Sequence, residues 1–290
     1  MAQFRTADII PLGTLVRGGE KTFQALDRFI PTGIESVEIS FWDTIPKSAD
    51  LFWMERIAER CEAAGIYISA LGIFANSLKN NELKTLAKKD WNTLVDFAQR
   101  FQIPVISGFT GRVPGKPVEV SFKPIEDFFT PVANRCLNSG IKLAFENCPM
   151  EGNKVDGDWN IAFLPELWEI LFNHIFPTDA VGLEFDPAHC VRLKLPVLDL
   201  LNDWLPRIHH IHGKDASNQP PQEFRFPGEG SVDWLKIMKL IQTSGYAGTI
   251  DLEGYHGEFI SHEYEMDNQR KSLNYLKECR LSSARGHSIN

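Results

Sequence analysis

Four short segments in the second half of the chain end a predicted β-strand with a side chain that binds metal ions well. In each segment an apolar run stops at an acid or a histidine, and these residues are Glu146, Asp186, His212 and Glu253. Three carboxylates and one imidazole form a hard, mostly oxygen donor set, which suits Mn²⁺, Mg²⁺, Co²⁺ or Zn²⁺. The residue types therefore predict a site for one divalent metal ion.

The spacing of these residues predicts how they meet. They follow one another at intervals of roughly 25 to 40 residues, about the length of one strand and one returning helix. In a parallel barrel the carboxyl ends of all the strands lie on the same face. Residues that are far apart in the sequence would then converge on one point of that face.

Strand and helix patterns alternate along the whole chain. Strands are predicted at 9–16, 36–42, 65–74, 103–109, 142–146, 181–185, 207–213 and 248–253, and helices at 20–30, 49–65, 82–101, 121–139, 164–173, 196–204, 231–243 and 262–280. An open doubly wound sheet would also alternate, but LGTLVRGG (12–19) does not match its usual phosphate loop. The pattern therefore favours an α/β fold, a single-domain (β/α)8 TIM barrel.

The barrel is expected to cover residues 1–281. Residues 282–290, SSARGHSIN, are polar and without periodicity, so we expect a flexible C-terminal tail. The N-terminus lacks the basic and apolar regions of a signal peptide, and no apolar stretch of about 18 residues occurs. Five widely spaced cysteines without a CxxC pair are typical of free thiols in a reducing compartment. We therefore expect a cytoplasmic protein.

The charge balance bears on the partners. The chain has 30 Lys and Arg against 38 Asp and Glu, a formal net charge of −8. That balance disfavours binding to nucleic acids or to anionic membranes, because both depend on basic residues. We expect a small-molecule substrate, with no nucleic-acid partner and no membrane partner. The sequence is compatible with a homo-oligomer and does not define one.

Three further residues are candidates for substrate contacts. His189 follows Asp186 by three positions across Pro187, so it should project into the same pocket. Lys214 either forms a rim ion pair with Asp215 or holds a substrate oxygen. Glu38 alternates with apolar residues in SVEIS and is expected to point into the barrel mouth, where it would contact substrate.

The histidines around position 210 divide by strand periodicity. His210 and His212 are two residues apart, so both should face the barrel interior, with His212 at the rim and His210 one layer deeper as a hydrogen-bonding residue. His209 should face the other way. Trp42, Phe74 and Trp159 either form apolar pocket walls for sugar C–H faces or pack in the core.

Five motifs give the chain a family resemblance. They are ENCPM (146–150), FDPAH (185–189), HIHGKD (210–215), FPGEGSVDW (226–234) and IDLEG (250–254). In order and spacing they resemble the sugar isomerase/epimerase family of xylose isomerase-like barrels, over about residues 5–280. The resemblance implies one divalent metal ion held by Glu146, Asp186, His212 and Glu253. It also implies that Glu146 and Glu253 act as catalytic acid and base, and that His189 contacts substrate.

The chain departs from parts of the family pattern. Ketose 3-epimerases carry an arginine shortly after the seventh-strand histidine, where this chain reads DASNQPPQ (215–222) with Arg225 later. Many relatives have a second acid after the last ligand, and Gly254 and Tyr255 replace it here. The apurinic-endonuclease branch binds three zinc ions with histidines from early strands, and this chain has no histidine before His174.

Several activities share one chemical beginning. A metal ion chelated by a hydroxy-ketone acidifies the neighbouring C–H and stabilises an enediolate. Return of the proton gives epimerisation or isomerisation of a sugar, sugar phosphate or polyol, which is the leading hypothesis. Loss of a β-hydroxyl instead gives dehydration, as in inosose dehydratase-like lyases. A metal-dependent hydrolase or nuclease and a catalytically silent, ligand-binding barrel remain as further alternatives.

Overall fold

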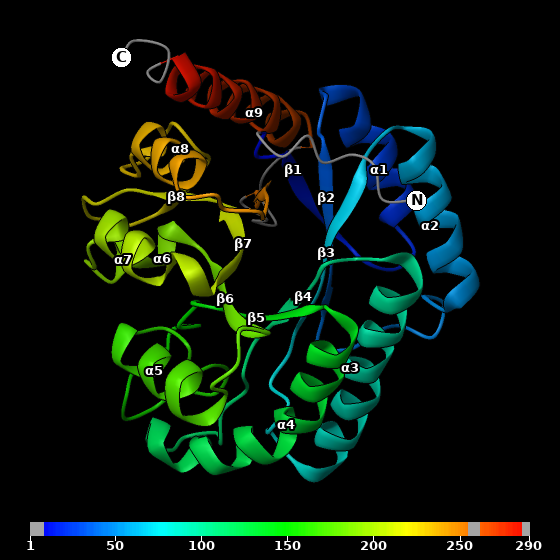
Figure 1. Cartoon of the computed structure of the whole chain (residues 1–290), viewed down its shortest axis with the longest axis vertical. Coiled ribbons are helices and arrows are strands. Elements are labelled where there is room, and N and C mark those ends of the chain that lie inside the picture. The colour runs from blue at the N-terminus through cyan, green and yellow to red at the C-terminus, as the bar shows by residue number, and fades with distance from the viewer. Residues whose placement is uncertain (1–8, 255–261, 286–290) are drawn as a thin grey trace.

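Eight parallel strands close into a barrel in the computed structural model, which describes residues 9–254 and 262–285 (Figure 1). Around the barrel the strand order is β1-β10-β7-β6-β5-β4-β3-β2. The strands are β1 Leu12–Arg17, β2 Ser36–Trp42, β3 Tyr67–Phe74, β4 Val105–Gly108, β5 Lys142–Glu146, β6 Val181–Phe185, β7 Ile208–Gly213 and β10 Ile250–Leu252. The predicted (β/α)8 TIM barrel is confirmed.

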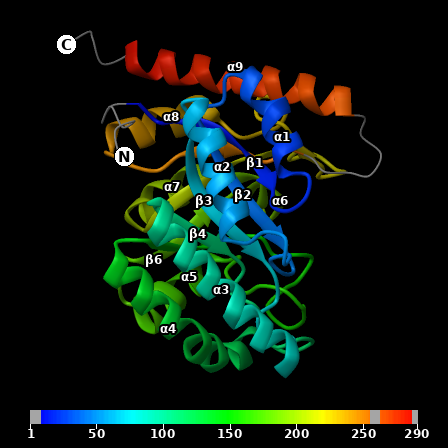
Figure 2. The same ribbon diagram turned by 90° about the vertical axis from the view of Figure 1, so that its right-hand side faces the viewer.

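Helices cover the outside of the barrel. They are α1 Thr22–Phe29, α2 Leu51–Ala63, α3 Asn81–Phe101, α4 Phe122–Ser139, α5 Pro165–Glu169, α6 Pro187–Arg192, α7 Val197–Trp204, α8 Trp234–Thr243 and α9 His262–Arg285. A π-helical segment, Ile170–Ile175, continues α5. Helix α9 lies beside α8 and reaches β1, so it covers the seam between the first and last strands (Figures 1 and 2). None of the helices in these described ranges combines the length and apolarity of a membrane span.

Local signals in the sequence set the helix ends. Asp50 and Asn80 precede α2 and α3, and their side chains accept hydrogen bonds from Trp53 N and Leu83 N, both at 2.9 Å. Such caps satisfy backbone N–H groups that have no partner inside the helix. At the other end, Gly140 follows α4 with φ +69°, a conformation that glycine adopts without strain.

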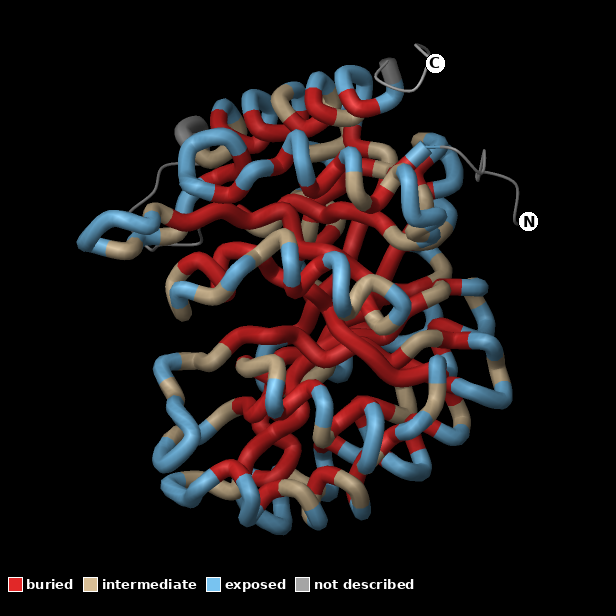
Figure 3. Tube along the Cα trace, turned by 60° about the vertical axis from the view of Figure 1, so that its left-hand side comes forward, coloured by how far each residue is buried: buried red, intermediate tan, exposed pale blue. Residues whose placement is uncertain are grey.

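The barrel interior is unusually polar. TIM barrels are usually filled by branched apolar side chains, whereas here Glu38, Glu184, His210 and Asp251 are all 0% exposed within it. Hydrogen bonds cross the barrel, as from Ser69 on β3 to Asp251 on β10. Apolar packing is instead concentrated between the strands and the helices, and Figure 3 shows buried chain at the centre with exposed chain on the outer helices. A polar interior requires that nearly every group find a partner.

Three segments differ from the expectations. The residues after Asp186, where no helix was predicted, form helix α6, because Asp186 caps it and Pro187 suits its first position. The loop at 214–230 contains a small hairpin of β8 Asp215–Ala216 and β9 Phe224–Arg225. Helix α9 continues to Arg285, so residues 282–285 of the expected tail are helical, with Ser283 buried and hydrogen-bonded to Gln242. Residues 286–290 lie outside the described residues.

The cysteines agree with the expectation of free thiols. Cys61, Cys136, Cys148, Cys190 and Cys279 are all buried and unpaired. Burial raises the pKa of the Cys61 and Cys136 thiols to about 12, because the charged thiolate loses its hydration. These two thiols therefore act as small core side chains.

Candidate metal centre

Glu146 and Asp186 stand side by side at the ends of two neighbouring strands. Glu146 is the last residue of β5 and Asp186 directly follows β6. The Asn147 side chain clamps the two strand ends together, since its amide donates to Asp186 O at 2.9 Å and its oxygen accepts from Asp186 N at 2.6 Å. Asp186 Oδ1 accepts from Ala188 N at 2.8 Å, as the cap of α6. Oδ2 is thereby left for the pocket side.

His212 and Glu253 complete a ring of four side chains. His212 lies on β7, and Glu253 follows the neighbouring strand β10. His212 Nδ1 lies 3.1 Å from Glu146 Oε1 and 3.1 Å from Glu253 Oε2. One ligand atom from each of the four predicted residues lies within 4.8 Å of the others. We call this set the ligand ring: Glu146, Asp186, His212 and Glu253.

The contacts of His212 show which of its nitrogens faces the ligand ring. His212 Nε2 lies 3.0 Å from Glu38 Oε2, a carboxylate oxygen that accepts, so we assign the proton to Nε2. Nδ1 faces the Glu146 and Glu253 carboxylates: it donates a proton to them when the imidazole is charged, and it offers a lone pair to a cation once that proton is released. Asp186 Oδ2 and Glu253 Oε2 are buried and accept no hydrogen bond from the described residues. Acceptors that face one another without a donor fit a bound cation.

The electrostatics of the ring agree with that fit. Burial, together with the Glu253 and Glu146 carboxylates, raises the pKa of Asp186 to about 6, although His189 and Lys214 oppose the shift. Burial would lower the pKa of His212, but the neighbouring carboxylates raise it well above its ordinary value. The raised pKa values show that the carboxylates around Asp186 and His212, with Glu184 and Glu38 beneath the ring contributing most at His212, favour positive charge there.

Lys214 lies inside the pocket. Its Nζ is 2.7 Å from Glu253 Oε1 and 3.7 Å from Asp186 Oδ2. The alternative of a rim ion pair with Asp215 is wrong, because the buried Asp215 carboxylate accepts backbone hydrogen bonds from Ala216 at 2.8 Å and Val232 at 2.9 Å. Lys214 is thus available to a ligand bound beside Glu253.

His189 reaches the pocket from α6, as expected from its position after Asp186. Its Nε2 lies 3.2 Å from Asp186 Oδ2 and 3.6 Å from Glu146 Oε1, without hydrogen-bond geometry to either. Neither ring nitrogen makes a hydrogen bond within the described part of the chain. A buried imidazole that makes no hydrogen bond and lies beside the ring can donate a hydrogen bond to a substrate hydroxyl or accept one from it.

Glu38 lies below the pocket floor and does not line the cavity. Its Oε2 accepts from His212 Nε2, and its Oε1 accepts from Ser107 Oγ at 3.1 Å. The predicted substrate contact is therefore not what the structure shows. The reason is depth, because Glu38 lies four residues before the end of β2 and its side chain ends beneath His212.

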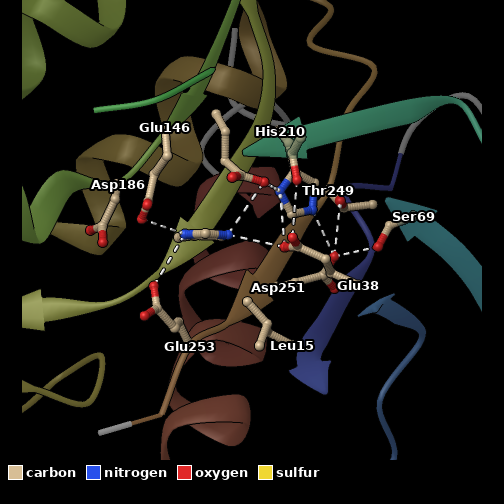
Figure 4. A network of polar contacts seen from close by, with 12 residues as sticks. Leu15, Glu38, Ser69, Glu146, Asp186, His210, Thr249, Asp251 and Glu253 are labelled. Carbon is tan, nitrogen blue, oxygen red and sulfur yellow. Dashed lines mark hydrogen bonds and ion pairs between the residues drawn. The ribbon is translucent and has the colours of Figure 1, made fainter. Parts of the chain in front are cut away.

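A second polar cluster lies beneath the ring. His210 Nδ1 is 3.0 Å from Glu184 Oε1, and His210 Nε2 is 2.8 Å from Asp251 Oδ2. Asp251 also accepts hydrogen bonds from the Ser36 and Ser69 hydroxyls. Figure 4 shows this cluster on one side and Glu146, Asp186 and Glu253 on the other. We call it the buried network: Glu38, Glu184, His210 and Asp251.

The sequence analysis missed two members of the buried network. Glu184 and Asp251 are charged residues inside otherwise apolar strands, and each precedes a ring residue by two positions. Residues two apart in a strand share a face, so the same periodicity that placed His210 beneath His212 could have placed Glu184 beneath Asp186. The deeper, hydrogen-bonding role expected for His210 agrees with the structure.

A cavity of about 900 Å³ opens above the ligand ring. Glu146, His189, His212, Lys214 and Glu253 line its floor and one side. Trp42, Phe74 and Trp159, which the sequence left between pocket wall and core, also line it, together with Phe109 and Phe224. Arg225 does not line it and instead pairs with Glu223 at 2.6 Å. The arrangement joins proton-transfer groups to an apolar wall.

A family model described as "Xylose isomerase-like TIM barrel" matches residues 30–279 of the chain. The chain belongs to this family. Solved xylose isomerase-like structures overlay nearly the whole chain. L-ribulose 3-epimerase matches with a TM-score of 0.75 at 14% identity, covering 97% of this chain and 98% of its own. A xylose isomerase domain protein from Planctomyces limnophilus matches with a TM-score of 0.74 at 16% identity, covering 95% and 99%. At these identities the likeness shows the fold.

Similarity to a curated relative is more local. Inosose dehydratase from Lacticaseibacillus casei is 35% identical over 91 residues, which is 26% of this chain and 30% of the relative. The match thus spans less than a third of that relative's length. The proteins that resemble this chain therefore include both an epimerase and a dehydratase.

Proposed function

We propose that this xylose isomerase-like barrel binds one divalent metal ion in the ligand ring and catalyses isomerisation or epimerisation of a sugar, sugar phosphate or polyol by proton transfer. The ligands are Glu146, Asp186, His212 and Glu253. One observation carries the proposal: one ligand atom from each of the four residues lies within 4.8 Å of the others, and two of the carboxylate oxygens, Asp186 Oδ2 and Glu253 Oε2, accept no hydrogen bond from the described residues. Mn²⁺, Mg²⁺, Co²⁺ and Zn²⁺ all accept this donor set.

Glu253 and Glu146 are the acid and base of the proposed reaction. A bound divalent ion would supply the charge that acidifies the C–H beside a substrate carbonyl. Burial opposes ionisation of Glu253, but the Lys214 ammonium at 2.7 Å lowers its pKa well below the ordinary value. The pKa of Glu146 is lowered as well, because contacts with His189 and His212 outweigh its burial. Both carboxylates are therefore ionised at neutral pH and able to take up a proton.

Lys214 and His189 position the substrate in this proposal. The Lys214 ammonium and the free nitrogens of His189 flank the ring on the cavity side, so they can hold substrate oxygens next to it. A proton taken by one glutamate and returned by the other on the opposite face gives epimerisation. A proton taken and returned by the same glutamate, at the neighbouring carbon, gives isomerisation.

Dehydration is the second candidate, and the local similarity to inosose dehydratase favours it. Loss of a hydroxyl group requires a proton donor beside the leaving oxygen. His189 is placed to supply that donor, since it lines the cavity and its nitrogens make no hydrogen bond within the described residues, although Nε2 lies 3.2 Å from Asp186 Oδ2. A dehydrated product absorbs in the ultraviolet and an epimer does not, so absorbance of the products separates the two reactions.

Metal content tests the proposal first. We expect close to one Mn, Co, Zn or Mg per chain in protein purified without chelator, measured by elemental analysis. Asp186→Asn should lose the metal while it keeps the cap of α6, because an amide oxygen can still accept from Ala188 N. Asp203→Asn, at an exposed carboxylate on α7, serves as the control and should retain it.

Two outcomes would overturn the assignment. Protein that takes up no metal even after addition of Mn²⁺ would remove the metal centre from the ligand ring. Two or three ions per chain would favour the alternative of a metal-dependent hydrolase or nuclease. One ion per chain would justify a screen of keto-sugars for deuterium uptake from D₂O, with mass spectrometry as the readout.

A further inference from the structure

Four aromatic rings form a continuous series from the ligand ring to the pocket mouth. The Phe74 ring centre lies 6.2 Å from that of His212, and Phe109 lies 5.2 Å from Phe74. Trp42 follows at 6.3 Å from Phe109, and Trp159 at 5.6 Å from Trp42. All four aromatic residues line the cavity. We call this series the aromatic arm: Phe74, Phe109, Trp42 and Trp159.

The outer half of the aromatic arm is accessible to a ligand. Phe74 and Phe109 are buried, but Trp42 is 41% exposed and Trp159 is half-buried. Large apolar side chains left open in a concave site usually contact a ligand. Counted from His212, the two tryptophans are the third and fourth rings. The series of rings therefore extends beyond Phe74, and a group attached to a sugar at the ligand ring could reach the tryptophans along it.

The segment that carries Trp159 is built in place before any ligand binds. The Asn160 side chain donates to Glu146 O and Cys148 O, both at 2.8 Å, and its oxygen accepts from Thr110 Oγ1 at 2.8 Å. Asn160 therefore ties Trp159 directly to the end of β5, where Glu146 sits. A preformed wall lowers the entropy cost of binding, as in a specific subsite.

Arg112 fixes the other side of the same loop. Its guanidinium is 0% exposed and donates to Asn153 O at 2.6 Å and to Lys116 O at 2.6 Å. A fully buried arginine that holds only backbone carbonyls has a structural role, and here that role is to lock the loop from β5 to α5. Trp159 is thus fixed in place beside the cavity, half-buried, with the Lys79 ammonium 5.9 Å from its ring centre.

We propose that the substrate is a sugar that carries an aromatic substituent, so that the sugar binds at the ligand ring and the substituent stacks on Trp42 and Trp159. This inference rests on the proposed function for the position of the sugar. The aromatic arm itself carries the choice of substituent: its members are rings without an acidic group, and planar groups stack on such rings with defined geometry. The cavity of about 900 Å³ is near the upper end of the range for small-molecule pockets and exceeds the need of one sugar ring.

Paired glycosides test the inference without turnover. Phenyl and methyl pyranosides of glucose, galactose, mannose and xylose are titrated into the metal-loaded protein by isothermal titration calorimetry. For at least one sugar we expect the phenyl glycoside to bind about tenfold or more tightly than its methyl partner. Trp42→Ala and Trp159→Ala should each reduce that ratio by about two- to tenfold.

A surface aromatic supplies the matched control. Phe52 lies on α2, is 67% exposed and does not line the cavity, so Phe52→Ala should leave the ratio unchanged. The inference fails if no sugar shows a phenyl preference, or if the preference survives both tryptophan substitutions. A different result would be that no sugar shows the phenyl preference and that Trp42→Ala dissociates an oligomer. The aromatic arm would then be a contact between copies of this chain.

The outcome is separable from that of the proposed function. Proton exchange into an unsubstituted keto-sugar, with no phenyl preference, would reject the aromatic subsite and keep the proton-transfer site. A phenyl preference that depends on Trp42 and Trp159, in a protein that exchanges no proton and binds no metal, would keep the subsite and reject the reaction.

Discussion

The ligand ring and the buried network consist of the same kinds of side chain and differ in their partners. In the buried network, His210 lies between Glu184 and Asp251 and donates to both, while serine hydroxyls donate to Asp251. These carboxylates raise the pKa of His210 to about 10 against the effect of burial, so it is an imidazolium ion at neutral pH. In the ligand ring, Asp186 Oδ2 and Glu253 Oε2 have no donor among the described residues.

This difference indicates two tasks for similar residues. Glu38, Glu184, His210 and His212 are grouped as closely as the ligand ring, within 4.8 Å, but protons on the two histidines already join them. Within the described residues, Glu184 Oε2 is the one carboxylate oxygen of the buried network that accepts no hydrogen bond, whereas the ligand ring leaves two such oxygens, Asp186 Oδ2 and Glu253 Oε2. His212 connects the two clusters, since its Nε2 contacts Glu38 in the buried network and its Nδ1 faces Glu146 in the ligand ring. Anchoring one nitrogen orients the other toward a metal ion.

The largest expected effect lies in the ligand ring. Glu253→Gln should lower proton exchange into a keto-sugar substrate by on the order of 10²- to 10⁴-fold, because an amide cannot act as a base. Deuterium uptake followed by mass spectrometry measures the exchange, and circular dichroism checks that the fold is kept. Glu229→Gln, at an exposed glutamate outside the cavity, is the control. Wild-type exchange in Glu253→Gln would show that the acid and base are assigned wrongly.

The next effect concerns stability and separates the two clusters directly. In chelator-treated protein, His210→Ala should lower the free energy of unfolding by about 3–5 kcal/mol, because it leaves Glu184 and Asp251 buried without their cation. His189→Ala removes a similarly buried imidazole that makes no hydrogen bond, so its cost should be smaller. Urea unfolding measures both. Equal losses of unfolding free energy in the two variants would contradict the distinction between the buried network and the ligand ring.

A third substitution tests whether the buried network orients the ring. Glu184→Gln should weaken metal affinity by about 10- to 100-fold without changing the number of ions bound, as expected when a group behind a ligand is altered. Competition with a fluorescent chelator gives the affinity. Glu169→Gln, at an exposed position on α5, is the reference. Unchanged affinity in Glu184→Gln would mean that the buried network serves the barrel alone.

The smallest effect concerns His209, on the opposite face of the strand that carries His210. Burial, with Lys142 and Arg207 nearby, lowers the pKa of His209 to about 3, whereas the unfolded chain takes up a proton near pH 6.5. Native His209 therefore stays neutral below pH 6.5, and stability falls as the pH drops from 6.5 toward 3.

The slope of this loss is at most about 1.4 kcal/mol per pH unit. Urea unfolding between pH 7.5 and pH 5 should show a shallower decline for His209→Gln than for the wild type. The exposed His174→Gln should retain the wild-type slope. If His209→Gln showed the same pH dependence of stability as the wild type, the lowered pKa of His209 would not be the cause of the decline.

The sequence was most informative where periodicity decides the structure. The barrel follows from alternating strand and helix patterns, and the convergence of Glu146, Asp186, His212 and Glu253 follows from strand ends that share one face. Whether the four bind a metal ion stays a prediction. The resemblance to xylose isomerase-like barrels is confirmed by the family match over residues 30–279.

Depth and partners were less accessible from sequence. Glu38 was placed on the correct face but one layer too high, because alternation gives the side of a strand and not the distance from its end. Lys214 pairs with Glu253, 39 residues away, rather than with its neighbour Asp215. Arg112 gave no signal, since nothing in the sequence indicates that its guanidinium holds the carbonyl groups of Lys116, 4 residues away, and of Asn153, 41 residues away.

The hydrogen bonds that Arg112 donates to backbone carbonyl groups have an evolutionary consequence. The loop between β5 and α5 is secured by Arg112 and Asn160 through backbone carbonyls, so its shape does not depend on the side chain at Trp159. Exchange of Trp159 would then alter which molecules fit while the proposed acid, base and metal ligands stay in place. Selectivity and reactivity are in this way inherited separately, and new substrates become reachable through single substitutions that leave the chemistry intact.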